Sequence, residues 1–174
     1  MATIAMLVQQ GALQRYDAVL GPRELETRRF FASSRLVKWF SEELSELGST
    51  WNIEVTPAEQ LDKLLRDYVV GKVLTYKFNF YPLAPHGSSV WELKTADLRV
   101  FGWFHTIDCF IGVVANTAQK VKDHNLYNGH LNEVIHFRQN LDLDHPKSIE
   151  GKEPKNVVSN FAYPDAPSSR SFRR

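Results

Sequence analysis

The chain contains a single cysteine and no long apolar run. Cys109 is the only cysteine among 174 residues, which excludes an intramolecular disulfide and a zinc site made of several cysteines. No apolar stretch approaches the roughly 18 residues that a membrane helix requires. The first ten residues also lack the charged start and long apolar region of a secretion signal. From these absences we expect a cytoplasmic protein in which Cys109 is the buried thiol of a strand.

An excess of one charge is also missing, since 21 Lys and Arg residues face 20 Asp and Glu residues and the net charge is +1. Binding to a nucleic acid would therefore depend on local clusters of basic side chains. The chain has no phosphate-binding glycine loop, no Gly-x-Ser-x-Gly nucleophile turn and no metal-site spacing. His130 and His136, six residues apart, cannot share one helical face well. We expect neither a metal nor a cofactor.

The composition is that of a packed protein, because 43% of the residues are apolar and 12% are aromatic. We predict a single α+β domain over residues 31–143, preceded by an N-terminal arm of uncertain structure, residues 1–30. The composition changes near the end, where residues 145–174 hold four of the eight prolines together with Ser, Lys and Arg. This change predicts an extended or disordered tail over residues 144–174.

Two helices are predicted in the first half of this domain. From Ser33 or Ser34, the candidate N-caps, apolar residues recur every three or four positions as far as Leu47, and we predict a helix over residues 31–47. The second helix, residues 57–70, has stronger local signals, because Thr56 and Glu59 form a capping box and Pro57 occupies the first helical position. The two helices should pair as a hairpin.

After the second helix the apolar period changes to that of a strand. The connections are short, so neighbouring strands should pair antiparallel. We therefore predict an α+β fold in which the helical hairpin packs on one face of an antiparallel sheet of about four strands, followed by a C-terminal helix and the extended tail. The predicted strands are residues 73–81, 89–95, 97–105 and 108–115, and the helices after them are a short one that Asn116 or Thr117 caps and a longer one at 129–141.

Apolar and charged residues alternate between Trp91 and Phe104, as in a half-buried strand. One face of these strands should therefore lie in the core, and the other should be available for function. The residues that we expect in the core are Leu98, Val100, Phe110 and either Val113 or Val114, with Leu64 and Leu65 packed against them.

Residues 91–101 read Trp-Glu-Leu-Lys-x-x-x-Leu-Arg-Val-Phe, and an apolar strand and a basic segment follow. This pattern resembles the RelE-type bacterial toxins and their phage-derived relatives of the HigB group. In that family a Trp-x-Leu-Arg/Lys strand leads into a second strand, a hydrophobic strand and a basic segment that ends near a tyrosine. The resemblance covers roughly residues 57–128. It implies a metal-independent endoribonuclease that cuts messenger RNA in the decoding site of the ribosome and that a small antitoxin protein inhibits.

Cleavage of RNA by its own 2′-hydroxyl needs a base, a cation that holds the phosphate and an acid for the leaving oxygen. Arg99 is the candidate phosphate clamp, because its planar guanidinium binds phosphate through two hydrogen bonds and a strand holds it in place. The resemblance also implies an active-site arginine at this point, and a basic residue near the scissile phosphate at Lys94. The structural alternative is a surface arginine paired with Asp97 or Glu92.

The basic segment after the last strand contains Lys120 and Lys122, which the resemblance implies as RNA-binding residues. Val121 stands where the family has an arginine, so charge in the transition state would have to be stabilised by lysines. Tyr127 falls where some of these toxins have a tyrosine that stacks on a base and acts as general base. His124 is the alternative acid or base, because histidine titrates near neutral pH.

Trp103 and Phe104 are adjacent on a predicted strand, so one should point inward and the other outward. An outward Trp103 beside Arg99 could stack on an RNA base. Packing of Trp103 against a terminal arm is an equal alternative.

Two other interpretations stay open. The first is a noncatalytic protein-binding module on the same scaffold, which the near-neutral charge and Val121 favour. The second is an unrelated α+β domain that matches the toxin pattern by chance. A groove lined by clustered basic residues would favour RNA, whereas an exposed apolar patch would favour a protein partner.

Overall fold

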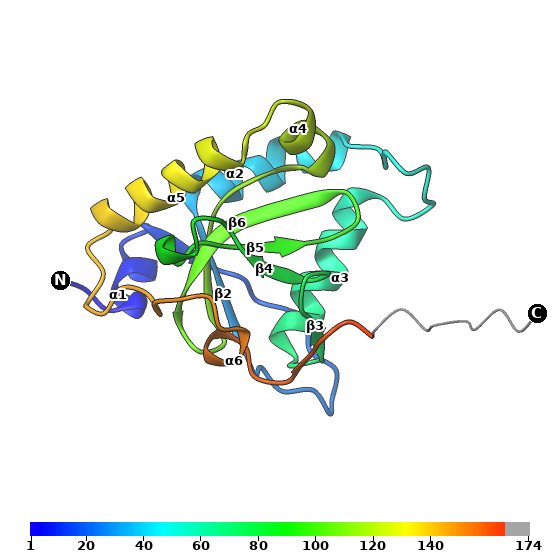
Figure 1. Cartoon of the computed structure of the whole chain (residues 1–174). Helices are drawn as coiled ribbons and strands as arrows, with labels where there is room; N and C mark the ends of the chain where they lie inside the picture. The colour runs from blue at the N-terminus through cyan, green and yellow to red at the C-terminus, as the bar shows by residue number, and fades with distance from the viewer. Residues whose placement is uncertain (166–174) are drawn as a thin grey trace, which may run out of the picture.

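The computed structural model describes residues 1–165 and contains a mixed six-stranded sheet, a two-stranded sheet and surrounding helices (Figure 1). The strands are β1 (Leu13–Arg15), β2 (Arg29–Ser33), β3 (Leu74–Thr75), β4 (Phe80–Pro82), β5 (Trp91–Lys94), β6 (Leu98–Thr106), β7 (Cys109–Thr117) and β8 (Phe161–Ala162). The α-helices are α1 (Ile4–Gln9), α2 (Ser34–Glu42), α3 (Pro57–Val69), α4 (Ala118–Asp123), α5 (Tyr127–Asn140) and α6 (Pro154–Val157), and short 3₁₀ helices span Leu44–Glu46 and His86–Ser88.

The large sheet has the strand order β1-β2-β7-β6-β5-β4. All neighbours in it pair antiparallel except β2 and β7, which run parallel with Phe30 opposite Phe110. The predicted α+β class is confirmed. The prediction of about four strands, all antiparallel, is wrong, because the N-terminal region supplies β1 and β2 and one of them pairs in parallel.

The first predicted helix is shorter than residues 31–47. Residues 31–33 belong to β2, where Phe31 and Ala32 are buried, and the helix begins only at Ser34. Ser33 ends the strand and caps α2, since its hydroxyl accepts a hydrogen bond from the amide of Leu36. The second helix is confirmed with nearly its predicted bounds, and its capping box is present.

The predicted strand at residues 73–81 is two short strands, β3 and β4, separated by a turn. Lys77 in this turn has a positive φ of 74°, and the side-chain oxygen of Asn79 accepts a hydrogen bond from the amide of Thr75. Such turns interrupt a strand although the apolar alternation continues through them. The strands predicted at 89–95, 97–105 and 108–115 correspond to β5, β6 and β7, and α4 and α5 follow.

Both faces of the large sheet are covered, so the prediction of one free face is wrong. Residues 98–104 of β6 are all buried. One apolar cluster joins α2 and α3 to one face, and a second joins α1, α4 and α5 to the other. The first cluster contains five of the predicted core residues, Leu64, Leu65, Leu98, Val100 and Phe110, whereas Val113 and Val114 are buried in the second.

The segment after α5 runs back along the molecule and below the large sheet in the view of Figure 1. The amide of Ile149 donates to the carbonyl of Phe104, and β8 pairs parallel with β3. Arg28, which is fully buried, donates to the carbonyls of Ser159 and Asn160 and so ties this segment to the N-terminal part of the sheet. Residues 166–174 of the predicted tail lie outside the described residues.

Candidate functional site

A row of polar residues crosses three strands at one end of the large sheet. The strand register places Lys94 of β5 opposite Arg99 of β6, and Arg99 opposite Asn116 of β7. The hairpin between β5 and β6 and the start of α4 lie at this end of the sheet. The register of the two antiparallel strand pairs therefore makes Lys94, Arg99 and Asn116 neighbours across the sheet.

Arg99 is 7% exposed, and its Nη1 donates to the carbonyl oxygens of Thr95 and Leu98 at 2.7 and 2.8 Å. These bonds fix the guanidinium at the hairpin. Its Nε has no hydrogen-bond partner among the described residues. The alternative in which Asp97 pairs with Arg99 is wrong, because the Asp97 carboxylate accepts hydrogen bonds from Ser49, Thr50 and Gln60.

Glu92 is the acidic centre of this region. Its side chain is almost fully buried, its Oε1 lies 3.9 Å from Lys94 Nζ, and its Oε2 has no hydrogen-bond partner within residues 1–165. Burial raises the pKa of the Glu92 carboxyl, and the charges of Lys94, Arg99 and Lys122 oppose that rise. Burial also lowers the pKa of the Lys94 ammonium, while Glu92 opposes the change. From the sequence, Glu92 was predicted only as a possible partner for Arg99.

Tyr127 lies in the first turn of α5, over β6. Its ring meets the ring of Phe101 edge to face, with centroids 6.0 Å apart. Burial raises the pKa of the Tyr127 phenol, the charge of Glu92 adds to the rise, and the neighbouring Arg99 guanidinium opposes it. The tyrosine is therefore held next to the candidate phosphate clamp.

We call Glu92, Lys94, Arg99, Lys122 and Tyr127 the Arg99 cluster. The structure thus brings together four of the residues singled out in the sequence, and adds Glu92. It places Lys120 elsewhere, in a second cleft described below. His124 is exposed at the end of α4, and no described contact joins it to the cluster. The roles of these residues in RNA binding or cleavage stay predictions.

The expectation of an outward Trp103 is wrong. The side chain is fully buried, its Nε1 donates to the carbonyl of Lys147 at 2.8 Å, and its ring packs against Phe137 and Arg138. Trp103 thus contacts α5 and the segment that follows it. A base cannot stack on Trp103 in this structure.

Two exposed aromatic side chains that the sequence analysis did not single out lie beside the Arg99 cluster. Trp51, 63% exposed, donates through its Nε1 to the carbonyl of Ala96, and Phe78 is 65% exposed. They line an open cleft of about 480 Å³ together with Lys77, Lys94 and Arg99, which we call the Trp51 cleft. Phe78 was assigned to a strand, and only the turn at residues 76–79 exposes it.

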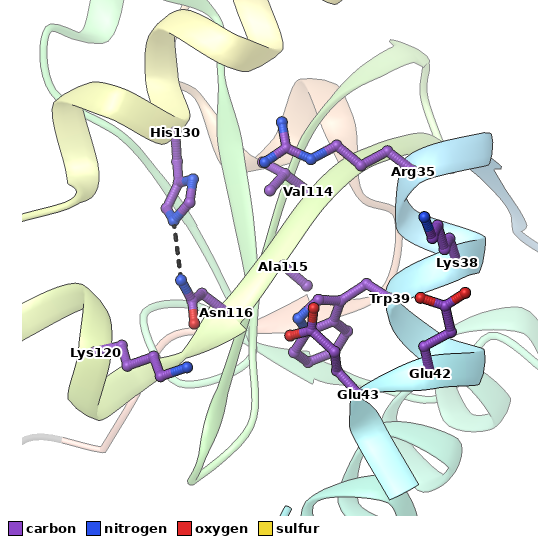
Figure 2. Close-up of a pocket in the computed structure, with 10 residues that line it drawn as sticks. All are labelled: Arg35, Lys38, Trp39, Glu42, Glu43, Val114, Ala115, Asn116, Lys120 and His130. Carbon is purple, nitrogen blue, oxygen red and sulfur yellow. Dashed lines mark hydrogen bonds between the residues drawn. The ribbon is translucent and has the colours of Figure 1, made fainter. Parts of the chain in front are cut away.

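A second cleft, of about 420 Å³, lies between α2 and the pair α4 and α5 (Figure 2). His130 of α5 borders it, and we call it the His130 cleft. His130 Nδ1 lies 3.1 Å from the carboxylate of Glu133, and its Nε2 lies 3.4 Å from the amide nitrogen of Asn116. Charged side chains of α2 and Lys120 of α4 complete the lining. The sequence analysis treated His130 only as a poor metal ligand, because the approach of α2 to α5 has no local signal.

Over residues 1–165 no group of three or more His, Cys, Asp or Glu side chains is arranged to hold a metal ion. Nor does this part of the chain contain a helix long and apolar enough to cross a membrane. Comparison with known protein families, with characterised proteins and with solved structures finds no match for the chain.

Proposed function

We propose that the chain is a RelE-like endoribonuclease that binds messenger RNA at the Arg99 cluster and cleaves it without a metal. The observation that carries the proposal is the convergence of three cationic side chains and a tyrosine, from two strands and two helices, beside an open cleft with two exposed aromatic rings. Cations that hold phosphates and aromatic rings that stack on bases are the elements of single-stranded RNA recognition.

The order of elements supports the same proposal. β5 and β6 carry the Trp-Glu-Leu-Lys and Leu-Arg-Val-Phe segments, and β7 and the basic helix α4 follow. Tyr127 comes directly after that helix. This is the order that the sequence resemblance implies. The proposed partners are messenger RNA, with the ribosome as the place of cleavage, and an inhibitory antitoxin, all in the bacterial cytoplasm.

Arg99 is proposed as the phosphate clamp. Two backbone carbonyls fix its Nη1, so the guanidinium loses little further freedom when it binds an anion. A positioned donor of this kind acts on the charge that develops on phosphate oxygens in the transition state. Lys94 and Lys122 add positive charge on either side, as point charges without the fork of arginine.

Proton transfer is assigned to Glu92 in preference to Tyr127. A phenol with a raised pKa is protonated at neutral pH and accepts no proton from a 2′-hydroxyl. Burial moves the pKa of Glu92 upward, toward the neutral range in which a carboxyl group serves as general acid or base. Tyr127 would then orient the Arg99 guanidinium, and its ring would stack on a nucleobase of the RNA.

A noncatalytic protein-binding module is the second candidate, because an apolar patch lies next to the same cleft. Five exposed apolar side chains belong to the loop before α3 and to the region of β3 and the following turn. Exposed apolar patches of this kind mark protein interaction sites. The side chains are Trp51, Ile53, Val55, Val73 and Phe78.

The test is induced expression in a bacterial host, followed by incubation of the purified protein with ribosomes and a labelled messenger RNA. Wild type should arrest growth and cut the RNA. Arg99→Ala should cut about 10²-fold more slowly with little change in RNA affinity, because the contact acts mainly in the transition state. Arg99→Lys should remain slow, since lysine keeps the charge without the fork.

Arg29→Ala is the matched control, because Arg29 is an exposed arginine of β2 outside the Arg99 cluster. It should cleave at the wild-type rate. If wild type never cuts RNA with or without ribosomes, or if Arg99→Ala cuts as fast as wild type, the ribonuclease proposal fails. The protein-binding module would then take its place.

A further inference from the structure

The His130 cleft forms where β7 extends beyond the end of its neighbour β2. The two strands pair only as far as Ala32 opposite Gly112, after which β2 ends and α2 turns away. Beyond that point Val114, Ala115 and Asn116 form the floor of the cleft. Figure 2 shows α2 on one side of this floor and α5 and α4 on the other.

A chain of polar contacts links α2 to α5 and ends at His130. Arg35 Nη1 lies 3.3 Å from the Glu133 carboxylate, which in turn holds His130 Nδ1 at 3.1 Å. A carboxylate at Nδ1 favours the tautomer with hydrogen on Nδ1, which leaves the lone pair on Nε2. Asn116 approaches Nε2 at only 3.4 Å, a long contact.

The imidazole is held rigidly in this position. His130 is 8% exposed, and its ring stacks on Phe101 with centroids 5.0 Å apart. A residue that is more than nine-tenths buried, and that still borders an open cleft with one ring nitrogen weakly bound, is well placed to contact a ligand there.

The cleft carries charges of both signs, and on α2 Lys38 lies between Arg35 and Glu42. Lys120 extends from α4 toward the middle of the cleft in Figure 2, on the same wall as His130. Glu42 and Glu43 stand at the opposite end, on α2 and just after it. None of these three has an ion-pair partner within 4.0 Å among residues 1–165, so all are available to a ligand. Trp39 lies between the two ends, half-buried, with its ring toward the cleft.

We propose that the His130 cleft binds a nucleotide, with the phosphate at Lys120 and Arg35 and with the His130 Nε2 lone pair accepting a hydrogen bond from a ribose hydroxyl or a base amino group. Arginine and lysine are the usual phosphate-binding side chains. The indole of Trp39 offers a surface on which a base can stack. The carboxylates at the far end would accept hydrogen bonds from base amino groups or ribose hydroxyls and would repel a second anionic group.

The size and the charge pattern select this ligand class. A cleft of about 420 Å³ lies within the usual range of small-molecule sites. A dicarboxylate would place one charge against Glu42 and Glu43, and a purely cationic ligand would meet Lys120 and Arg35. A mononucleotide combines an anionic phosphate with several hydrogen-bond donors, and so can contact both the cations and the carboxylates of the cleft.

This site is separate from the Arg99 cluster and does not depend on RNA cleavage. Lys120 and Lys122 are two residues apart on α4 and so point in different directions. Lys120 lines the His130 cleft, whereas the charge of Lys122 acts on Glu92 and Lys94. The nucleotide could be free or part of an RNA strand, and the experiment distinguishes these two sources.

Isothermal titration calorimetry on the full chain, at low salt, tests the proposal with adenosine monophosphate and with a single-stranded hexanucleotide. Either probe should bind with one site per chain. Lys120→Ala and Trp39→Leu should each weaken the binding about tenfold, the loss expected for one charged hydrogen bond or one stacked base. Lys152→Ala should not change it, because this exposed lysine lies outside the cleft.

Binding of the monophosphate assigns the cleft to free nucleotides, and binding of the hexanucleotide alone assigns it to an RNA strand. The proposal is overturned if neither probe binds up to about 10 mM, a limit that corresponds to less than about 3 kcal/mol of affinity. It is also overturned if Lys120→Ala binds as tightly as wild type. Lys120 is exposed, so its loss should leave the fold intact and the result interpretable. A chain that never cuts RNA can still pass this test, so failure of the two proposals is distinguishable.

Discussion

Two buried arginines stand in contrasting surroundings. Arg28 donates from both terminal nitrogens to four backbone carbonyls, and its Nε lies 3.3 Å from Asp108. Arg99 donates to only two carbonyls, and its neighbour Glu92 keeps one carboxylate oxygen without a partner in the described chain. The Nε atoms of both arginines are buried without a hydrogen-bond partner in the described chain, but Arg28 is enclosed and has Asp108 as its counter-ion, whereas Arg99 borders an open cleft. The difference separates an arginine that holds the fold together from one that is free to bind a ligand.

The largest expected effect is the loss of Arg28. Arg28→Met should lower the free energy of unfolding by about 3–5 kcal/mol, because it leaves buried carbonyls and the Asp108 carboxylate without their donor. Denaturant titration measures this loss. Arg29→Met is the control, since Arg29 is exposed and should change stability by no more than about 0.5 kcal/mol. Equal losses in the two variants would remove the structural role assigned to Arg28.

A residue of the apolar core provides a scale for this loss. Leu65 of α3 is 3% exposed in the cluster that contains Leu98 and Val100. Leu65→Ala should cost about 2–5 kcal/mol, the range for truncation of a core leucine. A loss below about 1 kcal/mol in the same titration would show that α3 is peripheral to the core.

Arg99→Met should cost less stability than either change, about 1–2 kcal/mol, because only two carbonyls lose their donor. The same variant should lose RNA cleavage, whereas Arg28 variants should lose cleavage only in proportion to the fraction that unfolds. If Arg99→Met lowers the free energy of unfolding as much as Arg28→Met does, the two arginines do not differ in structural role.

The smallest effect concerns pH. Burial raises the pKa of folded Glu92 above its ordinary value of 4.5, so the folded protein keeps a proton that the unfolded chain releases. The free energy of unfolding therefore falls as pH rises from the unfolded pKa toward the folded one. Glu92→Gln removes this loss. Its stability relative to wild type should increase between pH 4 and pH 7 in urea titrations, and a constant difference would contradict the buried, raised carboxyl.

The sequence predicted elements whose signals are local. The capping box at Thr56 located the start of α3, and the short connection before Asp97 located the β5–β6 hairpin. Elements that depend on distant partners were missed. The apolar run Phe30 to Ala32 is too short to predict a strand by itself, and pairing with β7 makes it one.

The candidate site was predictable to the same extent. Lys94 and Arg99 share a hairpin, and Tyr127 follows the next helix, so the chain order brings them near one another. The sequence did not predict that Trp103 is buried. Alternation of apolar and polar residues indicates a solvent-exposed face only where one face of the sheet is uncovered, and both faces of β6 are buried. The His130 cleft needs α2 beside α5, a contact between distant parts of the chain.

The parallel pairing of β2 with β7 also sets the order in which the protein can fold. Phe30 cannot pair until Phe110 has been synthesised. The Arg28 guanidinium cannot donate to the carbonyls of Ser159 and Asn160 until those residues have been added. Contacts of such long sequence separation slow folding. On a ribosome that adds roughly 5–20 residues per second, β1 and β2 would stay unpaired with the rest of the sheet for several seconds. The apolar segment Phe30 to Ala32 therefore stays without its partner strand throughout that interval, which is when a chaperone could bind it.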